Sequence, residues 1–156
     1  MKRRASTMRR SDKEVTDQEE LEKIIRSSPV CRIGLCEGDR PYVVPVCFGY
    51  EAGRIYIHSN PCGKKMEMLR KNPRVCIEID SGIEPVPAES PCNWGMKYRS
   101  VIAFGTCRVL SGTDEKKNAL MIIMEHYGVN REEVPDFSPE GVDIISVEIE
   151  TITGKK

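Results

Sequence analysis

Hydrophobic and polar residues alternate along six stretches of the chain, with the period of two that a half-buried β-strand produces. In the clearest stretch, residues 54–59, Ile55 and Ile57 take one side and Tyr56 and His58 take the other. The six predicted strands cover residues 30–36, 41–50, 54–59, 75–79, 97–110 and 142–152. Turn signals at residues 37–39 and 51–53 join the first three strands, which predicts an antiparallel meander.

A helical period occurs at three places between these strands. The first helix follows Thr16-Asp17-Gln18-Glu19, which has the Thr-x-x-Glu form of a capping box. The second is short and ends before Pro73, and the third covers residues 114–127 with Thr113 as its cap. The residues expected on the buried faces are Leu21, Ile24, Ile25, Met66, Leu69, Leu120, Ile123, Met124 and Tyr127.

Six antiparallel strands with short flanking helices predict a mainly β fold. A small closed or split β-barrel is favoured, because a curled sheet hides its edge strands, and an open α+β sandwich is the alternative. Gly105 is expected to mark a bulge in the long fifth strand. Residues 81–91 contain Pro85, Pro87 and Pro91 and show no period, so we expect a long loop there.

The composition is typical of one globular domain. Of the 156 residues, 39% are hydrophobic and 31% are charged, and 24 Lys and Arg balance 24 Asp and Glu. We assign the domain to residues 11–153 and expect the basic segment 1–10 to be a disordered tail, with either Met1 or Met8 as the initiator. The zero net charge argues against nucleic-acid binding. No apolar run approaches the roughly 20 residues that span a membrane, so we expect a cytoplasmic protein.

Seven cysteines are scattered along the chain. Their number is odd, no two form a Cys-x-x-Cys pair, and neither His58 nor His126 lies beside one at the spacing of a zinc site. We therefore expect reduced thiols, most of them in the core, and no metal centre.

The densest group of polar residues runs from His58 to Lys65, from a strand end through a glycine-containing turn into a helix start. Free backbone N–H groups and the helix dipole favour an anion at such a place. Lys64 and Lys65 would add two positive charges, although a pair of lysines on a surface helix can equally be solvated. His58 either exchanges a proton with a ligand or is a structural side chain.

Residues 93–100 combine the only tryptophan with a tyrosine and two cations, directly after the proline-rich segment. Trp94, Tyr98 and Arg99 can stack on a flat ligand or form a dimer interface, and the two roles are compatible. Hydrolysis has no support, because the sequence contains no Gly-x-Ser-x-Gly elbow and no suitable Ser-His-Asp order.

Six short motifs occur in the order found in one family. They are Val30-Cys31-Arg32-Ile33-Gly34, Pro41-Tyr42-Val43-Val44-Pro45-Val46, Tyr56-Ile57-His58-Ser59, Gly63-Lys64-Lys65, Asn72-Pro73-Arg74-Val75 and Tyr98-Arg99-Ser100-Val101. Over residues 8–150 the chain resembles the flavoproteins related to pyridoxamine 5′-phosphate oxidase, and within them the nitroimidazole-reductase branch.

The resemblance implies a six-stranded FMN-binding split barrel that forms a homodimer with two shared flavin sites. The residues that it assigns to the cofactor are Val44, Pro45, Val46, His58, Ser59, Lys64 and Lys65. The valines and proline would lie along the isoalloxazine ring, the histidine and serine would contact the flavin, and the lysines would hold its phosphate. His58 would also face the substrate as the catalytic residue. With a flavin as the flat ligand, the residues expected to complete the site are Trp94, Tyr98, Arg99 and Ser100.

These features predict an FMN-dependent oxidoreductase that reduces a small electron-poor substrate, such as a nitroaromatic, with NAD(P)H as the donor. The cations that pyridoxamine 5′-phosphate oxidases place on the flavin-binding strand have no equivalents in residues 44–48, which argues against that oxidase activity. The alternative is a non-catalytic protein of the same fold that binds or carries a flavin or haem. Use of flavin F420 in place of FMN is also open.

Overall fold

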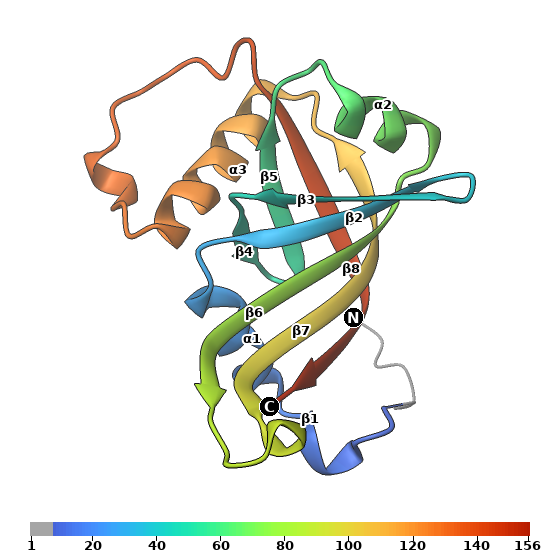
Figure 1. Ribbon diagram of the computed structural model, residues 1–156. Helices are drawn as coiled ribbons and strands as arrows, with labels where there is room; N and C mark the ends of the chain where they lie inside the picture. Colours follow the sequence, from blue (N-terminus) through green and yellow to red (C-terminus); the bar gives the residue numbers. More distant parts are fainter. Residues whose placement is uncertain (1–7) are drawn as a thin grey trace.

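The computed structural model describes residues 8–156, in which eight strands and three α-helices alternate (Figure 1). Residues 1–7, most of the expected basic tail, lie outside the described residues. The strands are β1 Glu14–Val15, β2 Cys31–Glu37, β3 Arg40–Val46, β4 Gly49–Glu51, β5 Arg54–Ser59, β6 Arg74–Val86, β7 Gly95–Val109 and β8 Asp143–Lys155. The helices are α1 Gln18–Ser27, α2 Lys64–Lys71 and α3 Thr113–His126, with short 3-10 turns η1 Ser11–Lys13, η2 Pro91–Asn93 and η3 Arg131–Glu133.

All the strands belong to one antiparallel sheet, in the order β3-β2-β6-β7-β8-β5-β4, with β1 added beside β8. The sheet curls around its core, but within residues 8–156 no strand pairing joins β3 to β4, so the barrel is split (Figure 1). The predicted mainly β split barrel is therefore confirmed. The strand number is eight rather than six, because the stretch 41–50 divides into β3 and β4 and the short β1 is added.

The predicted meander of the first three long strands is wrong at its third member. β2 pairs with β3, but β5 pairs with β8 and the short β4. The cause is Phe48, whose fully buried ring turns the chain into the core after β3. Its N–H donates to the hydroxyl of Tyr127 at 3.2 Å instead of to a neighbouring strand.

The loop expected over residues 81–91 is also wrong in its first half. β6 continues to Val86 and pairs with the start of β7, which forms a two-stranded ribbon that we call the arm, residues 81–99. The register shifts between Ser81 and Glu84, and Gly82 has a φ of 62°, so a bulge bends the ribbon and accommodates Pro85 at its edge. The bulge predicted at Gly105 is confirmed by a register shift between Phe104 and Gly105.

The core fills the inside of the barrel with β-branched side chains. Ile33, Ile55, Ile57 and Ile77 are completely buried, and each such side chain stabilises the fold by roughly 1.5–3 kcal/mol relative to exposure. Helix α1 packs against β6 and β7 and contributes its predicted residues Leu21, Ile24 and Ile25. Its N-cap is Asp17 rather than Thr16, because the Asp17 carboxylate accepts the Glu20 N–H at 2.9 Å.

Helix α3 packs on the outside of β4, β5 and β8, beside a second small cluster formed by Leu110, Ala119 and Ile144. Its buried face differs in part from the predicted one. Ile123 is buried and Leu120 is partly buried as predicted, but Ala119, Met121 and Ile122 are also buried, whereas Met124 and Tyr127 are 41% and 43% exposed. The reason is the close approach of α3 to β4 at Gly49, which turns residues 119–123 toward the sheet. Thr113 is the first helical residue, and Gly112 is the N-cap. None of the helices in residues 8–156 is long and apolar enough to span a membrane.

Candidate functional site

The turn between β5 and α2 is held by its own side chains. The Asn60 side chain accepts a hydrogen bond from the Cys62 N–H at 2.9 Å, and the Ser59 hydroxyl donates to the Asn60 carbonyl at 3.0 Å. Gly63, the N-cap of α2, has a φ of 111°, which L side chains rarely adopt. No side chain in the described part of the chain caps this helix, so its first N–H groups remain available to an anion. We call residues 59–65 the anion turn.

The two lysines of the anion turn have different environments. The Lys64 ammonium lies 3.3 Å from a carboxylate oxygen of Glu37, the last residue of β2, and the other carboxylate oxygen of Glu37 accepts from Lys71 at the far end of α2. These two lysines hold the pKa of Glu37 below its usual range, Lys71 more strongly than Lys64. Lys64 is therefore turned toward the β2–β3 hairpin.

Lys65 is half-buried and forms no ion pair within residues 8–156. Burial lowers its pKa, and the neighbouring Cys31 thiol acts weakly in the opposite direction. Cys31 is the first residue of β2, the strand against which α2 packs, and is the strand partner of Val46. A half-buried cation without a carboxylate partner is costly unless an anion joins it.

The valine-proline-valine segment lies on β3, an edge strand of the sheet. Val44 and Val46 pack against the core, whereas Pro45 is exposed on the opposite face together with Val43. Proline is tolerated on such an edge because it has no N–H to donate. His58 is exposed near the end of β5, next to the buried Ser59. The structure thus gathers His58, Ser59, Lys64 and Lys65 around one turn.

The predicted aromatic and cationic group lies on the arm. Trp94 is 57% exposed, and its indole N–H donates to the Ala88 carbonyl at 2.8 Å. The Tyr98 hydroxyl accepts a hydrogen bond from Lys155, whose ammonium lies 5.0 Å from the centre of the tyrosine ring. Arg99 is exposed and Ser100 is half-buried.

This group is far from the anion turn within one protomer. Along β8, Ser59 is the partner of Asp143 and Ser100 is the partner of Lys155, so the two sites lie at opposite ends of a 13-residue strand. At about 3.3 Å per residue, these ends are separated by roughly 40 Å of strand. Figure 1 shows α2 at one end of the molecule and the arm at the other. Within one protomer, the two predicted groups therefore lie at opposite ends of β8.

An apolar patch on the outside of the sheet was missed from the sequence. Val43, Gly34, Cys76 and Phe104 are successive partners across β3, β2, β6 and β7. Val43 is 61% exposed and Phe104 is 46% exposed, and a shallow hollow of about 340 Å³ lies between them. We call these four residues and Ile102 the outer apolar patch. Its signal in the sequence is the run from Val101 to Phe104, which is apolar on both faces of the strand.

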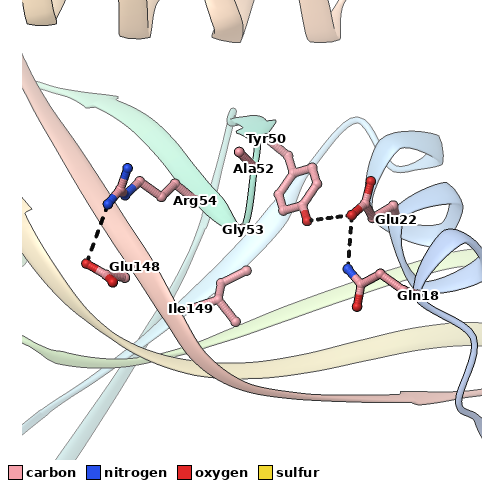
Figure 2. A pocket seen from close by; sticks show the side chains of 8 residues that line it. All are labelled: Gln18, Glu22, Tyr50, Ala52, Gly53, Arg54, Glu148 and Ile149. Atoms are coloured by element: carbon pink, nitrogen blue, oxygen red, sulfur yellow. Dashed lines mark hydrogen bonds and ion pairs between the residues drawn. The ribbon is translucent and has the colours of Figure 1, made fainter. Parts of the chain in front are cut away.

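The largest described hollow lies elsewhere, between the start of α1 and the turn from β4 to β5 (Figure 2). It has a volume of about 400 Å³. The buried Tyr50 donates to Glu22 at 3.3 Å, and Gln18 donates to the same carboxylate oxygen at 2.9 Å. Across the hollow, Arg54 faces Glu148 at 3.8 Å. Because these groups satisfy one another, the contacts join α1 to the barrel and need no ligand.

Within residues 8–156, no three His, Cys, Asp or Glu side chains come together as a metal-binding group. Cys31 and Cys107 are buried in the core, and burial raises their thiol pKa values to about 12 and about 11. Cys47, Cys62 and Cys92 are exposed. His126 has a structural partner, because its ring lies 2.8 Å from the Ser28 carbonyl.

Comparison with known proteins places this geometry in context. The family model described as pyridoxamine 5′-phosphate oxidase matches residues 17–156. A solved structure from Bacteroides thetaiotaomicron, described as a candidate 5-nitroimidazole antibiotic resistance protein, is 34% identical with a TM-score of 0.79. The match covers 91% of this chain and 85% of that one.

Two further relatives are more distant. The FAD and haem binding protein from Mycobacterium smegmatis is 20% identical with a TM-score of 0.83, over 92% of this chain and 72% of that one, and shows the fold alone. The uncharacterized protein RA0666 from Rhizobium meliloti is 29% identical over 99 residues, or 64% of this chain. The matched region spans 58% of the length of that curated relative.

Proposed function

The chain belongs to the pyridoxamine 5′-phosphate oxidase family, and we propose that it is an FMN-dependent oxidoreductase that reduces small electron-poor molecules. The observation that carries the proposal is Lys65, a half-buried ammonium that forms no ion pair within residues 8–156, beside the start of α2, which no side chain of these residues caps. A phosphate group supplies the anion that both features favour. The donor set therefore fits a phosphorylated flavin.

The chain's own residues divide the work of binding. Lys65 and the first N–H groups of α2 hold the phosphate, and Lys64 adds a second charge when it turns from Glu37. The β3 segment Val44–Val46 would line the ring, where Pro45 would offer an apolar surface without an N–H. Ser59 shapes the turn through its bond to Asn60.

Bound FMN supplies hydride transfer between a nicotinamide donor and the substrate. For a nitroaromatic, the first two-electron step is R–NO₂ + NAD(P)H + H⁺ → R–NO + NAD(P)⁺ + H₂O. His58 is the proposed proton source, because it is exposed at the strand end that leads into the anion turn. Similarity to the Bacteroides thetaiotaomicron protein, at 34% identity, supports an electron-poor nitro compound as substrate.

We propose that the working unit is a homodimer joined through the outer apolar patch. Apolar side chains of this size on one sheet face are typical of an interface. A second copy would also bring together the two groups that lie at opposite ends of β8. The partner's arm can place Trp94, Tyr98, Arg99 and Ser100 beside a flavin held by the first copy's anion turn. The same arrangement would cover the exposed indole of Trp94.

The deciding experiment is anaerobic addition of NADPH or NADH to the FMN-loaded protein. We expect the yellow absorption band to bleach and to return when a nitroaromatic is added. If the protein binds FMN but neither donor bleaches it, the protein is a flavin carrier. A Soret band in the purified protein would instead indicate haem, and absence of FMN binding would remove the proposal altogether.

A further inference from the structure

We propose that Glu37 is a specificity-determining positioning residue, which competes with the flavin phosphate for Lys64 and so limits how strongly the site prefers FMN over riboflavin. The inference rests on the proposed function of the anion turn. It concerns a residue on the β2–β3 hairpin, outside the segments that the family motifs assign to the cofactor.

The contacts of Glu37 place an anion between both ends of α2. One carboxylate oxygen lies 3.3 Å from Lys64 at the start of the helix, and the other accepts from Lys71 at its end. The hairpin is fixed there by a second contact, because the Asn72 amide donates to the Cys36 carbonyl at 3.1 Å. Glu37 is therefore held against the helix and cannot move freely away from Lys64.

This arrangement gives the two lysines of the anion turn different states. Lys65 has no carboxylate partner, whereas Lys64 is already paired. A phosphate at the start of α2 gains Lys64 only by taking it from Glu37. This competition weakens phosphate binding and leaves the uncharged parts of the flavin unaffected.

The size of the effect follows from the exposure of the pair. The side chains of Lys64 and Glu37 are 52% and 31% exposed, and the surrounding water weakens the attraction within such an exposed ion pair. Neutralising Glu37 should therefore tighten FMN binding about 1.5- to 5-fold. Riboflavin, which has no phosphate, should bind with unchanged affinity.

The test compares dissociation constants for FMN and riboflavin, measured by quenching of flavin fluorescence, in the wild type and Glu37→Gln. The control is Glu125→Gln on α3, which also removes one negative charge and breaks an exposed ion pair, that of Glu125 with Arg131 at 2.9 Å, whereas Glu37 pairs with two lysines. We expect the FMN constant to fall in Glu37→Gln only, with the riboflavin constant unchanged in all three proteins.

A second comparison tests whether Glu37 affects FMN binding through Lys64. In a Lys64→Gln background, the Glu37→Gln change should improve FMN binding no more than Glu125→Gln does. The proposal is overturned if Glu37→Gln leaves FMN affinity unchanged or weakens it while the wild type still prefers FMN to riboflavin. It is equally overturned if the full gain persists without Lys64. If the wild type does not distinguish FMN from riboflavin, the anion turn binds no phosphate and the proposed function falls as well.

Discussion

Single side chains in the anion turn show how much the surroundings of a charge matter. Lys64 and Lys65 are chemically identical neighbours. Lys64 is exposed and paired with Glu37, whereas Lys65 is half-buried and forms no ion pair within the described residues. Only the second carries a desolvation penalty that a bound anion would relieve. We therefore expect Lys65 to dominate phosphate binding.

Replacement of Lys65 by methionine should weaken FMN binding by about 10- to 150-fold, because a charge-assisted hydrogen bond contributes about 1.5–3 kcal/mol. Riboflavin affinity should change little. The free protein should melt at the same or a higher temperature, since methionine fills the half-buried site without a charge. Titration with both flavins checks the prediction, and equal losses for the two would show that Lys65 acts through the fold.

The lowered pKa of Lys65 also predicts a pH dependence. FMN phosphate favours the charged lysine, so binding should weaken as the pH rises through the pKa of Lys65, and at a lower pH than an ordinary lysine would cause. Lys65→Arg should remove this alkaline loss, because a guanidinium stays protonated. FMN titrations at a series of pH values test this, and identical profiles for the two proteins would contradict it.

His58 is exposed and none of its contacts restrains it within the described chain, so its role should lie in turnover rather than in flavin retention. His58→Ala should keep FMN affinity within about 3-fold and lower nitroaromatic reduction by about 100-fold or more, the range of general acid catalysis. Stopped-flow reoxidation of the reduced protein measures the second quantity. Loss of bound FMN with an unchanged circular dichroism spectrum would show that His58 instead binds the cofactor.

At the scale of elements, α3 is positioned by one close backbone approach. A Cβ at Gly49 would lie 2.6 Å from the Ile122 carbonyl oxygen, closer than real Cβ atoms come. β4 and α3 can therefore pack at this distance only if residue 49 is glycine.

Gly49→Ala should lower the free energy of unfolding by about 1–3 kcal/mol, because the helix must move away from the sheet. Gly95→Ala is the matched control, since a Cβ there meets only the Val86 side chain at an ordinary 3.8 Å. Urea denaturation followed by circular dichroism measures both. Equal stability of the two variants would show that α3 can shift without cost.

At the scale of the whole molecule, the two halves of the predicted site lie at opposite ends of the barrel. The anion turn follows β5, and the aromatic arm joins β6 to β7 (Figure 1). The outer apolar patch between them lies on the exposed face of the sheet. A dimer through this patch would make each flavin site from both chains.

Phe104→Lys should convert the proposed dimer into monomers and weaken FMN binding, because a charge replaces an exposed apolar side chain of the patch. The matched control is Met124→Lys on α3, where the side chain is 41% exposed compared with 46% for Phe104. Light scattering at micromolar concentration gives the mass of each variant. A monomeric wild type that retains FMN would contradict both the dimer and the shared site.

Local patterns in the sequence determined most of the long strands, the helix α1 and the turn between β5 and α2. The alternation of Ile55 and Ile57 with Tyr56 and His58 is confirmed, and so are the buried face of α1 and the bulge at Gly105. These features depend on side-chain periods and backbone preferences within about ten residues, which the amino-acid order contains directly.

The tertiary structure decided what depends on distant neighbours. Phe48 is buried in the core and β5 pairs with β8. Glu37 pairs with Lys64 of the anion turn, and the arm lies far from the anion turn along β8. In each case the partner is set by how the curled sheet brings remote segments together. The hydrophobic effect drives burial without specifying which surfaces meet. Only the folded chain therefore shows that Lys64 pairs with Glu37, while Lys65 forms no ion pair within the described residues.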